Sequence, residues 1–267
     1  PFNRISMGIQ TFDDATLTLL KRRHNARTAI EAVSRCRQAG FDNISIDLIY
    51  GLPGETKERW ENDLRQAIDL QVEHISAYHL IYEEDTPIYS MLKQHQVCEV
   101  DEESSLEFFT LLIEQLQKAG FEQYEISNFC RPGKHSRHNT SYWKGIPYLG
   151  CGASAHSFDG TTREWNVSSI DLYIIGIEEN RRAFEIEHLD PTTRYNEFII
   201  TTMRTAWGTP LEQLKKTFGK ERWEYCLNMA APYLQSGKLE ERNGALCLTR
   251  EGIFVSDSIM SDLLWVD

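Results

Sequence analysis

The 267-residue sequence lacks long apolar runs and has no excess of positive charge. No hydrophobic segment reaches the roughly 20 residues of a membrane-spanning helix, and nothing at the amino terminus resembles a signal peptide. The formal net charge is −12. An acidic surface repels the phosphates of nucleic acids and anionic lipid headgroups. We therefore expect neither nucleic-acid binding nor membrane association.

Cysteine is sparse, and its six positions are scattered. Because no two cysteines form a C-x-x-C pair, the sequence predicts neither a zinc ribbon nor a thioredoxin-type redox site. Few, widely spaced thiols are typical of a reducing compartment. We therefore expect a cytoplasmic protein with free thiols at Cys36, Cys98, Cys130, Cys151, Cys226 and Cys247.

Strand and helix patterns alternate over the first eighty residues. Strands are predicted at 3–10, 43–51 and 74–81, and the second is apolar almost throughout, as in a parallel sheet covered on both faces. Apolar spacing predicts two helices between them, the first ending at Gly40 and the second capped by Thr56. We expect these helices to bury Ala26, Ile30 and Val33, and Trp60, Leu64 and Ala67 or Ile68.

A similar unit follows after an insertion. Residues 102–119 have helical spacing, and Ala-Gly-Phe then leads into a strand pattern, as it does after the first helix. Alternation of this kind predicts an α/β fold with right-handed parallel crossovers, arranged like a barrel. We expect the helix to bury Leu106, Phe109, Ile113 and Leu116.

The pattern changes after about residue 190. Short helices, a longer helix, a hairpin turning at Asn243-Gly244 and a last helix with Val255, Ile259 and Leu263 in register resemble a winged-helix module. Residues 195–267 carry 8 Lys and Arg against 10 Asp and Glu, a balance of 8 − 10 = −2. We therefore expect this region to pack or to bind a protein rather than DNA.

Polar residues stand where the predicted strands end. Gln10 ends the first strand, Asp47 and Tyr50 belong to the second, and Arg22 follows the first. Ligands of parallel α/β barrels bind at the carboxyl ends of the strands. An amide, a carboxylate and a guanidinium there suit a zwitterionic or nucleoside ligand. A buried ion pair between Arg22 and Asp47 explains the same residues, and the spacing leaves both interpretations open.

The segment 148–157, YLGCGASAHS, contains Ser154 and His156. It matches only the first half of the G-x-S-x-G elbow of hydrolases, because His156 replaces the closing glycine. We therefore disfavour hydrolysis and expect a tight backbone approach at this stretch, which is rich in glycine and alanine.

The segment 134–145, KHSRHNTSYWKG, concentrates basic, imidazole and aromatic side chains. A zinc site of Cys130, His135, His138 and Cys151 would match no common zinc spacing and would draw all its ligands from loops. A haem site is the other option, since imidazole ligates haem iron and aromatic rings offer flat apolar faces. The residues alone favour a polar loop whose aromatic rings fill the barrel rim. For haem, the propionate partners would be Lys134, Arg137 and Lys144.

Several stretches appear together in a family-specific order: NRISMGIQTFDD, NISIDLIYGLPGET, HISAYHL, YEISNF, SRHNTSYWKG and YLGCGASAHS. Over nearly the whole chain the sequence resembles the radical-SAM family of oxygen-independent coproporphyrinogen dehydrogenases (the HemN-like family), and within it the haem-chaperone branch of the HemW type. The most specific element is H-N-x-x-Y-W at 138–143, which marks that branch.

The resemblance implies a partial (β/α)6 radical-SAM barrel with a [4Fe-4S] cluster and S-adenosylmethionine (SAM). It assigns Gln10, Arg22 and Asp47 to SAM. It assigns His138, Asn139, Tyr142 and Trp143 to haem, with His138 as ligand of the iron. The domains implied are 1–170, the second half of the barrel with the haem motif, and 171–267, a helical, winged-helix-like domain of the HemN type.

One departure from the family is large. The C-x-x-x-C-x-x-C loop that holds the cluster in the family is missing, and the first strand here resembles the family's fourth. We therefore expect the chain, which begins at Pro1, to be a piece of a longer or processed polypeptide that cannot by itself form the cluster or cleave SAM. The missing half of the sheet would leave an open edge, so a homodimer is possible.

The function predicted is that of a haem chaperone, which binds haem and transfers it to an acceptor protein that the sequence does not name. Two alternatives stay open: a coproporphyrinogen III dehydrogenase using radical-SAM chemistry, and a non-catalytic scaffold or interaction module. Under the chaperone hypothesis, we favour a protein that is not an enzyme.

Overall fold

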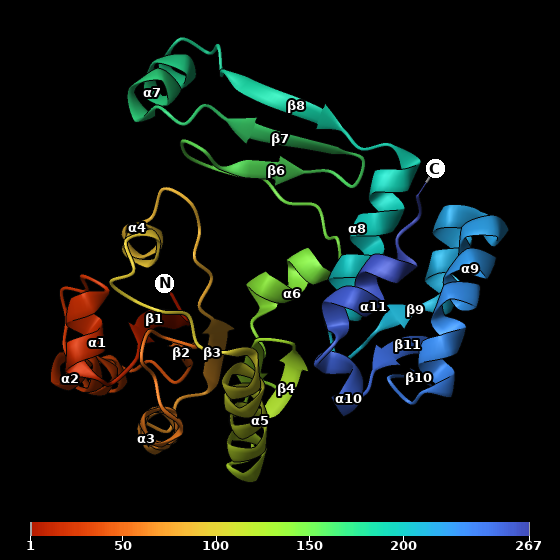
Figure 1. Cartoon of the computed structure of the whole chain (residues 1–267). Helices are drawn as coiled ribbons and strands as arrows, with labels where there is room; N and C mark the ends of the chain where they lie inside the picture. The colour runs from red at the N-terminus through yellow and green to blue at the C-terminus, as the bar shows by residue number, and fades with distance from the viewer. Residues whose placement is uncertain (1, 267) are drawn as a thin grey trace. The chain divides into compact units, whose positions relative to one another are not determined.

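The computed structural model describes residues 2–266 and consists of two compact units, which meet in sequence between Ser136 and Arg137 (Figure 1). The first unit contains one sheet, the second contains two three-stranded sheets, and each unit has its own helices. The predicted boundary between residues 170 and 171 lies within the second unit, and as a division into domains it stays a prediction.

A mixed sheet of five strands forms the centre of the first unit. Its first three strands are parallel, and helices connect them, which confirms the predicted α/β fold. In spatial order the strands are β1 (Ile5–Gln10), β2 (Ile44–Tyr50), β3 (His74–His79), β5 (Asn128–Cys130) and β4 (Glu122–Glu125). The helices are α1 (Asp14–Leu19), α2 (Ala26–Gln38), α3 (Lys57–Asp69), α4 (Pro87–Lys93) and α5 (Glu102–Lys118).

The far side of this sheet is antiparallel. Strand β5 pairs antiparallel with both β3 and β4, so the second Ala-Gly-Phe stretch leads into a hairpin. The expectation of a regular barrel-like continuation is therefore wrong at this point. The reason is the two-residue connection 126–127, which allows only antiparallel neighbours, because parallel strands need a long crossover. At the other side, β1 is the edge of the sheet.

The buried faces of the helices agree in part with the predicted ones. In α3, Trp60, Leu64 and Ala67 are fully buried, and the Thr56 side chain accepts a hydrogen bond from the Arg59 backbone N–H (3.4 Å). In α5, Phe109, Ile113 and Leu116 are buried as predicted.

Two residues predicted to face inward are exposed. Ile30 of α2 is 39% exposed and Leu106 of α5 is 44% exposed. In α2 the buried stripe instead contains Ala29 and Val33, which are four residues apart, and Ile30 lies 100° around the helix from Ala29. Apolar spacing located these helices but did not define which part of a broad apolar arc contacts the sheet.

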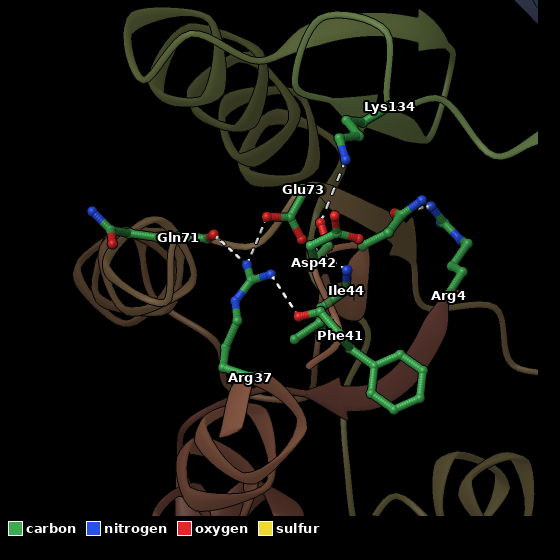
Figure 2. A network of polar contacts seen from close by, with 9 residues as sticks. Arg4, Arg37, Phe41, Asp42, Ile44, Gln71, Glu73 and Lys134 are labelled. Carbon is green, nitrogen blue, oxygen red and sulfur yellow. Dashed lines mark hydrogen bonds and ion pairs between the residues drawn. The ribbon is translucent and has the colours of Figure 1, made fainter. Parts of the chain in front are cut away.

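A polar network closes the sheet at the amino ends of β2 and β3 (Figure 2). Arg37 of α2 forms an ion pair with Glu73 (2.7 Å) and donates to the backbone carbonyls of Gln71 and Phe41. The other carboxylate oxygen of Glu73 accepts from the Ile44 backbone N–H at 2.8 Å. The network thus joins α2 to the starts of two strands.

The second unit begins with α6 (Arg137–Trp143) and contains a separate antiparallel sheet. The sequence patterns predicted none of its strands. Every residue of its last strand is exposed, so that strand has no buried face to reveal it. The sheet consists of β6 (His156–Phe158), β7 (Thr162–Asn166) and β8 (Phe184–His188), with α7 (Ile170–Glu178) between β7 and β8.

The rest of the second unit matches the winged-helix-like pattern of helices and a hairpin. Asn243 and Gly244 have positive φ angles of 54° and 75° at the hairpin turn, as predicted. The elements are α8 (Pro191–Met203), β9 (Thr209–Pro210), α9 (Leu211–Gln235), β10 (Leu239–Arg242), β11 (Ala245–Leu248), α10 (Arg250–Ile253) and α11 (Ser256–Leu263).

Two details refine this pattern. The backbone leaves the helical conformation at Gly219 (φ 87°, ψ 174°), so α9 consists of two helical segments, as the sequence predicted. Val255 precedes α11 and is 38% exposed, so it does not share the buried face of Ile259 and Leu263. None of the described helices has both the length and the apolar character needed to cross a membrane.

Candidate functional site

One face of the parallel strands is polar. Side chains alternate between the faces of a strand, so Ser6, Asp47 and Ser76 lie on the same face in adjacent strands. The opposite face carries Ile46 and Ile75, which are fully buried. The sheet therefore has an apolar face on one side and a polar, partly buried face on the other.

Gln10 and Arg22 meet at Gly8, at the carboxyl end of β1. The Arg22 guanidinium donates a hydrogen bond to the Gly8 carbonyl oxygen (3.1 Å). The register with β2 shifts between Gly8 and Gln10, and Gln10 has a φ of 72°. A Cβ atom at position 8 would lie only 2.7 Å from Gln10 Nε2. The glycine therefore leaves the space into which the Gln10 amide turns.

Asp47 lies opposite Gly8 in the β1–β2 register. Its carboxylate accepts a hydrogen bond from the Ser6 hydroxyl (3.3 Å). Partial burial raises the pKa of this carboxyl group, although hydrogen bonds from Ser6 and Ser76 act against the shift. Among the described residues Arg22 and Asp47 form no ion pair, so the alternative of a buried pair is wrong. Gln10, Arg22 and Asp47 thus gather at one end of the sheet without neutralising one another.

Tyr50 belongs to the apolar face instead. Its ring is stacked with Phe109 (6.2 Å between centroids) and tilted against Trp60 (5.5 Å). Burial raises the pKa of its hydroxyl group. Tyr50 is therefore a core residue and is not available to a ligand on the polar face.

A buried network on the polar face was missed by sequence reasoning. His74 Nδ1 lies 2.8 Å from the Ser45 hydroxyl, and His74 Nε2 lies 2.7 Å from the Tyr124 hydroxyl. Burial, assisted by the positive charge of Arg4, lowers the pKa of the His74 imidazole to about 3. The imidazole is therefore neutral at physiological pH. Ser45 comes from β2 and Tyr124 from β4, so only the folded sheet brings them to His74 and no local motif marks them.

The haem-motif segment forms a helix in the second unit. The prediction that this segment is a loop is therefore wrong for α6. His138 and Tyr142 are four residues apart and lie on one face of α6, as i and i+4 residues do. The imidazole Nε2 is 3.2 Å from the Tyr142 hydroxyl, and the two rings meet edge to face with centroids 5.0 Å apart. Both side chains are exposed, so a ligand can reach the imidazole.

Asn139 and Trp143 occupy another face of α6 and are also four residues apart. The Arg204 guanidinium lies over the Trp143 ring, 5.4 Å from its centroid. The indole N–H of Trp143 is buried and has no hydrogen-bond acceptor within residues 2–266. A buried donor without an acceptor is costly and calls for an explanation such as a bound ligand.

A cavity of about 300 Å³ adjoins the motif within the second unit. Tyr142 and Trp143 line one side of it, and residues of α8 and α9 line another. Six aromatic side chains contribute to its walls: Tyr142, Trp143, Tyr148, Phe158, Phe198 and Phe218. A flat apolar group therefore finds matching surfaces beside the exposed His138.

The segment 148–157 shows the expected tight backbone approach. A Cβ atom at Gly150 would lie 2.1 Å from the carbonyl oxygen of His156. The His156 ring stacks on Trp165 with centroids 5.8 Å apart. Ser154 has a φ of 59° at the turn. This geometry explains the glycine and the histidine as parts of a compact turn.

No group of three or more His, Cys, Asp or Glu side chains is placed to hold a metal ion in residues 2–266. The four-ligand zinc alternative therefore has no support in that part of the chain. All six cysteines are free thiols, and Cys130, Cys226 and Cys247 are buried. They do not fit a [4Fe-4S] cluster, which needs several thiolates at fixed geometry.

Two family models match the chain. Residues 1–67 match the radical SAM superfamily, and residues 189–255 match the HemN C-terminal domain. The solved structure of coproporphyrinogen III oxidase (HemN) from Escherichia coli superposes with a TM-score of 0.78 at 19% identity, covering 98% of this chain and 64% of that one. This likeness confirms the fold class.

Curated proteins give closer relationships. The heme chaperone HemW of Bacillus subtilis is 30% identical over 98% of this chain and 69% of its own length. The HemW proteins of Synechocystis and Mycobacterium tuberculosis are both 31% identical over 98% of this chain, and the chain spans 68% and 66% of their lengths. The chain therefore belongs to the HemW family of heme chaperones within the radical SAM superfamily.

Proposed function

We propose that this chain carries the haem-binding site of a haem chaperone, with α6 as the element that holds the haem and His138 as ligand of the iron. The single observation that carries the proposal is the exposed His138 imidazole beside Tyr142 and an aromatic cavity. Imidazole is a common axial ligand of haem iron. The haem is cargo here, and an acceptor protein receives it.

The Tyr142 hydroxyl assists this role. It contacts Nε2 of His138, and Nδ1 has no partner among the described residues. A hydrogen bond at one ring nitrogen fixes the orientation of an imidazole whose other nitrogen binds a metal. Tyr142 would therefore hold the ring while Nδ1 binds iron. The Tyr142 ring packs edge to face against the Tyr148 ring, with centroids 4.9 Å apart, and this contact helps to hold Tyr142 in place.

Asn139 and Trp143 complete the proposed haem site. The Trp143 ring lines the cavity and offers an apolar face for the porphyrin. Asn139 precedes it by one helical turn and provides an amide on the same face of α6. Because an exposed site is open to solvent, release to an acceptor needs no large movement of α6.

SAM is proposed to bind on the polar face of the first unit. SAM offers a carboxylate, an amino group and ribose hydroxyls. Arg22 would bind the carboxylate, Asp47 would accept hydrogen bonds from the amino group or a hydroxyl, and Gln10 would bind the ribose or the amino-acid part. The Gln10 amide and the Arg22 guanidinium lie together over Gly8, which supports a shared ligand for these two side chains. The [4Fe-4S] cluster is proposed only for a longer form of the protein, so no reaction step is derived from it.

A cytoplasmic location and a second copy of the chain as a partner belong to the same proposal. The free thiols are compatible with a cytoplasmic location. Strand β1 is the edge of the five-stranded sheet, which supports pairing with further chain or with a second copy.

Titration with haem tests the function. We expect the chain to give a Soret band shift on binding, and His138→Ala to lower haem affinity at least tenfold and to abolish the ligand-specific shift. The matched control is His188→Ala, because His188 is an exposed histidine on β8 of the same unit. Metal-free protoporphyrin IX should bind both variants equally, since it offers no iron. Equal haem affinity and an equal Soret band for His138→Ala and the unchanged chain would refute the proposal.

A further inference from the structure

The cavity beside α6 is rich in hydrogen-bond donors and positive charge. Three cationic side chains line it: Arg163 from β7, Arg194 from α8 and Lys144 from the loop after α6. Among the described residues, Arg194 has no carboxylate partner, and Lys144 lies over the Trp207 ring, 5.1 Å from its centroid. The buried indole N–H of Trp143 adds a third donor without an acceptor.

The cavity offers little to balance these donors. Glu197 is the one carboxylate among the residues that line it, and Arg163 binds it at 2.6 Å. Arg163 also contacts Glu187 (3.3 Å), so its charge is already compensated. The net result is an aromatic cavity with two uncompensated cations, which favours a ligand that is flat, apolar and acidic. Arginine suits a carboxylate best because its planar fork can bind both oxygens.

The size of the cavity restricts how such a ligand enters. About 300 Å³ lies at the lower end of the range for small-molecule pockets. A complete porphyrin is larger, so only one edge of it fits inside. Tyr142 lines the cavity and also contacts His138, so the imidazole lies one side chain away from the cavity wall. An edge inserted there leaves the iron outside, near the exposed imidazole.

We propose that this cavity binds the propionate edge of the tetrapyrrole, with the Arg194 guanidinium as the main carboxylate partner and the Lys144 ammonium as the second. The proposal rests on the haem-binding function proposed above. It makes the HemN-type C-terminal region, whose family match includes Arg194, a direct part of the cargo site. It also predicts that the chaperone selects tetrapyrroles with free carboxylates over their esters.

The test compares two ligands on the same purified chain. Haem and haem dimethyl ester have the same iron and the same ring, but the ester has no charged carboxylates. We expect the unchanged chain to bind haem about tenfold more tightly than the ester, because hydrogen bonds to charged groups are among the stronger ones. Arg194→Gln should weaken haem binding about tenfold and leave the ester unaffected. Arg194→Lys should retain part of the preference.

The control is Lys216→Gln, which removes one positive charge from an exposed position of α9 outside the cavity. It should keep full haem affinity, and thermal unfolding should show that all variants are folded. If the unchanged chain binds haem and the ester equally and Arg194→Gln changes neither, the propionate site is refuted while haem binding stands. If the unchanged chain binds neither ligand, the haem-binding function itself is refuted.

Discussion

The Nε2 atom of His138 lies 3.2 Å from the hydroxyl oxygen of Tyr142, one helical turn further along α6. The contact joins the proposed iron ligand to a side chain that lines the aromatic cavity. Tyr142 therefore has two separable contributions, a hydroxyl group that orients the imidazole and a ring that forms part of the cavity wall.

Substitution of Tyr142 distinguishes these contributions. Tyr142→Phe should lower haem affinity about threefold to tenfold, because a single hydrogen bond contributes about 1 kcal/mol net. Tyr142→Ala should have a larger effect, since it also removes the ring that meets Tyr148. Absorbance titration with haem measures both. Tyr233→Phe, which removes an exposed tyrosine hydroxyl bound to Asp262, should leave affinity unchanged. A Tyr142→Ala variant with full affinity would contradict the proposed orientation of the imidazole.

The network at the amino ends of the strands predicts a purely structural effect. Arg37→Met should lower the free energy of unfolding by about 1–3 kcal/mol, because the guanidinium bonds Glu73 and two backbone carbonyls. Urea unfolding measures the loss. Arg27→Met on the same helix is the matched control, since the Arg27 side chain is 86% exposed and its ion pair is with Glu31, one turn along the same helix. Its effect should stay within about 0.5 kcal/mol. Similar losses for both variants would show that the network adds nothing.

The buried imidazole of His74 predicts a pH dependence of stability. Burial lowers its pKa to about 3, whereas the unfolded chain has a histidine pKa near 6.5. Between these values the unfolded state binds more protons, so the contribution of His74 is complete above about pH 6.5 and is lost as the pH falls toward 3. The loss approaches about 1.4 kcal/mol per pH unit.

A variant isolates this contribution. The difference in the free energy of unfolding between the unchanged chain and His74→Gln should shrink as the pH falls from 7 to 5. Urea unfolding at several pH values provides the measurement. A difference that is constant over this range would mean that the imidazole is not held neutral by its surroundings.

The turn at Gly150 predicts a steric effect. Gly150→Ala should destabilise the second unit by about 1–3 kcal/mol or more, because the new Cβ atom would meet the His156 carbonyl oxygen. Gly160→Ala is the control, since nothing lies within 4 Å of a Cβ atom there and only its φ of 102° opposes the substitution. Thermal unfolding compares the two. A smaller loss of stability for Gly150→Ala than for Gly160→Ala would show that the backbone around position 150 moves easily to admit a Cβ atom.

Sequence reasoning succeeded where apolar spacing and capping agree. Thr56, Trp60 and Leu64 located α3 because a cap and a repeated apolar position point to the same helix. It was less accurate for α2, because spacing does not show which side of a broad apolar arc contacts the sheet. Sequence reasoning did not predict the exposed strands. All five residues of β8 are exposed, so no buried face marks it as a strand.

The candidate site was predictable to a similar degree. The haem motif was recognised, but its conformation was not, because α6 has only seven residues and a polar composition. The spacing of His138 and Tyr142 was the available signal for a helix. Arg194 lies some fifty residues further along the chain and has no motif of its own, so only folding brings it to the same cavity as Trp143.

The Arg37–Glu73 network and the Gln10–Arg22 cluster occupy opposite rims of one sheet. The network that stabilises the sheet and the proposed SAM contacts are therefore separate sets of residues. Substitutions that strengthen the first rim can be made without touching the proposed ligand contacts at the second.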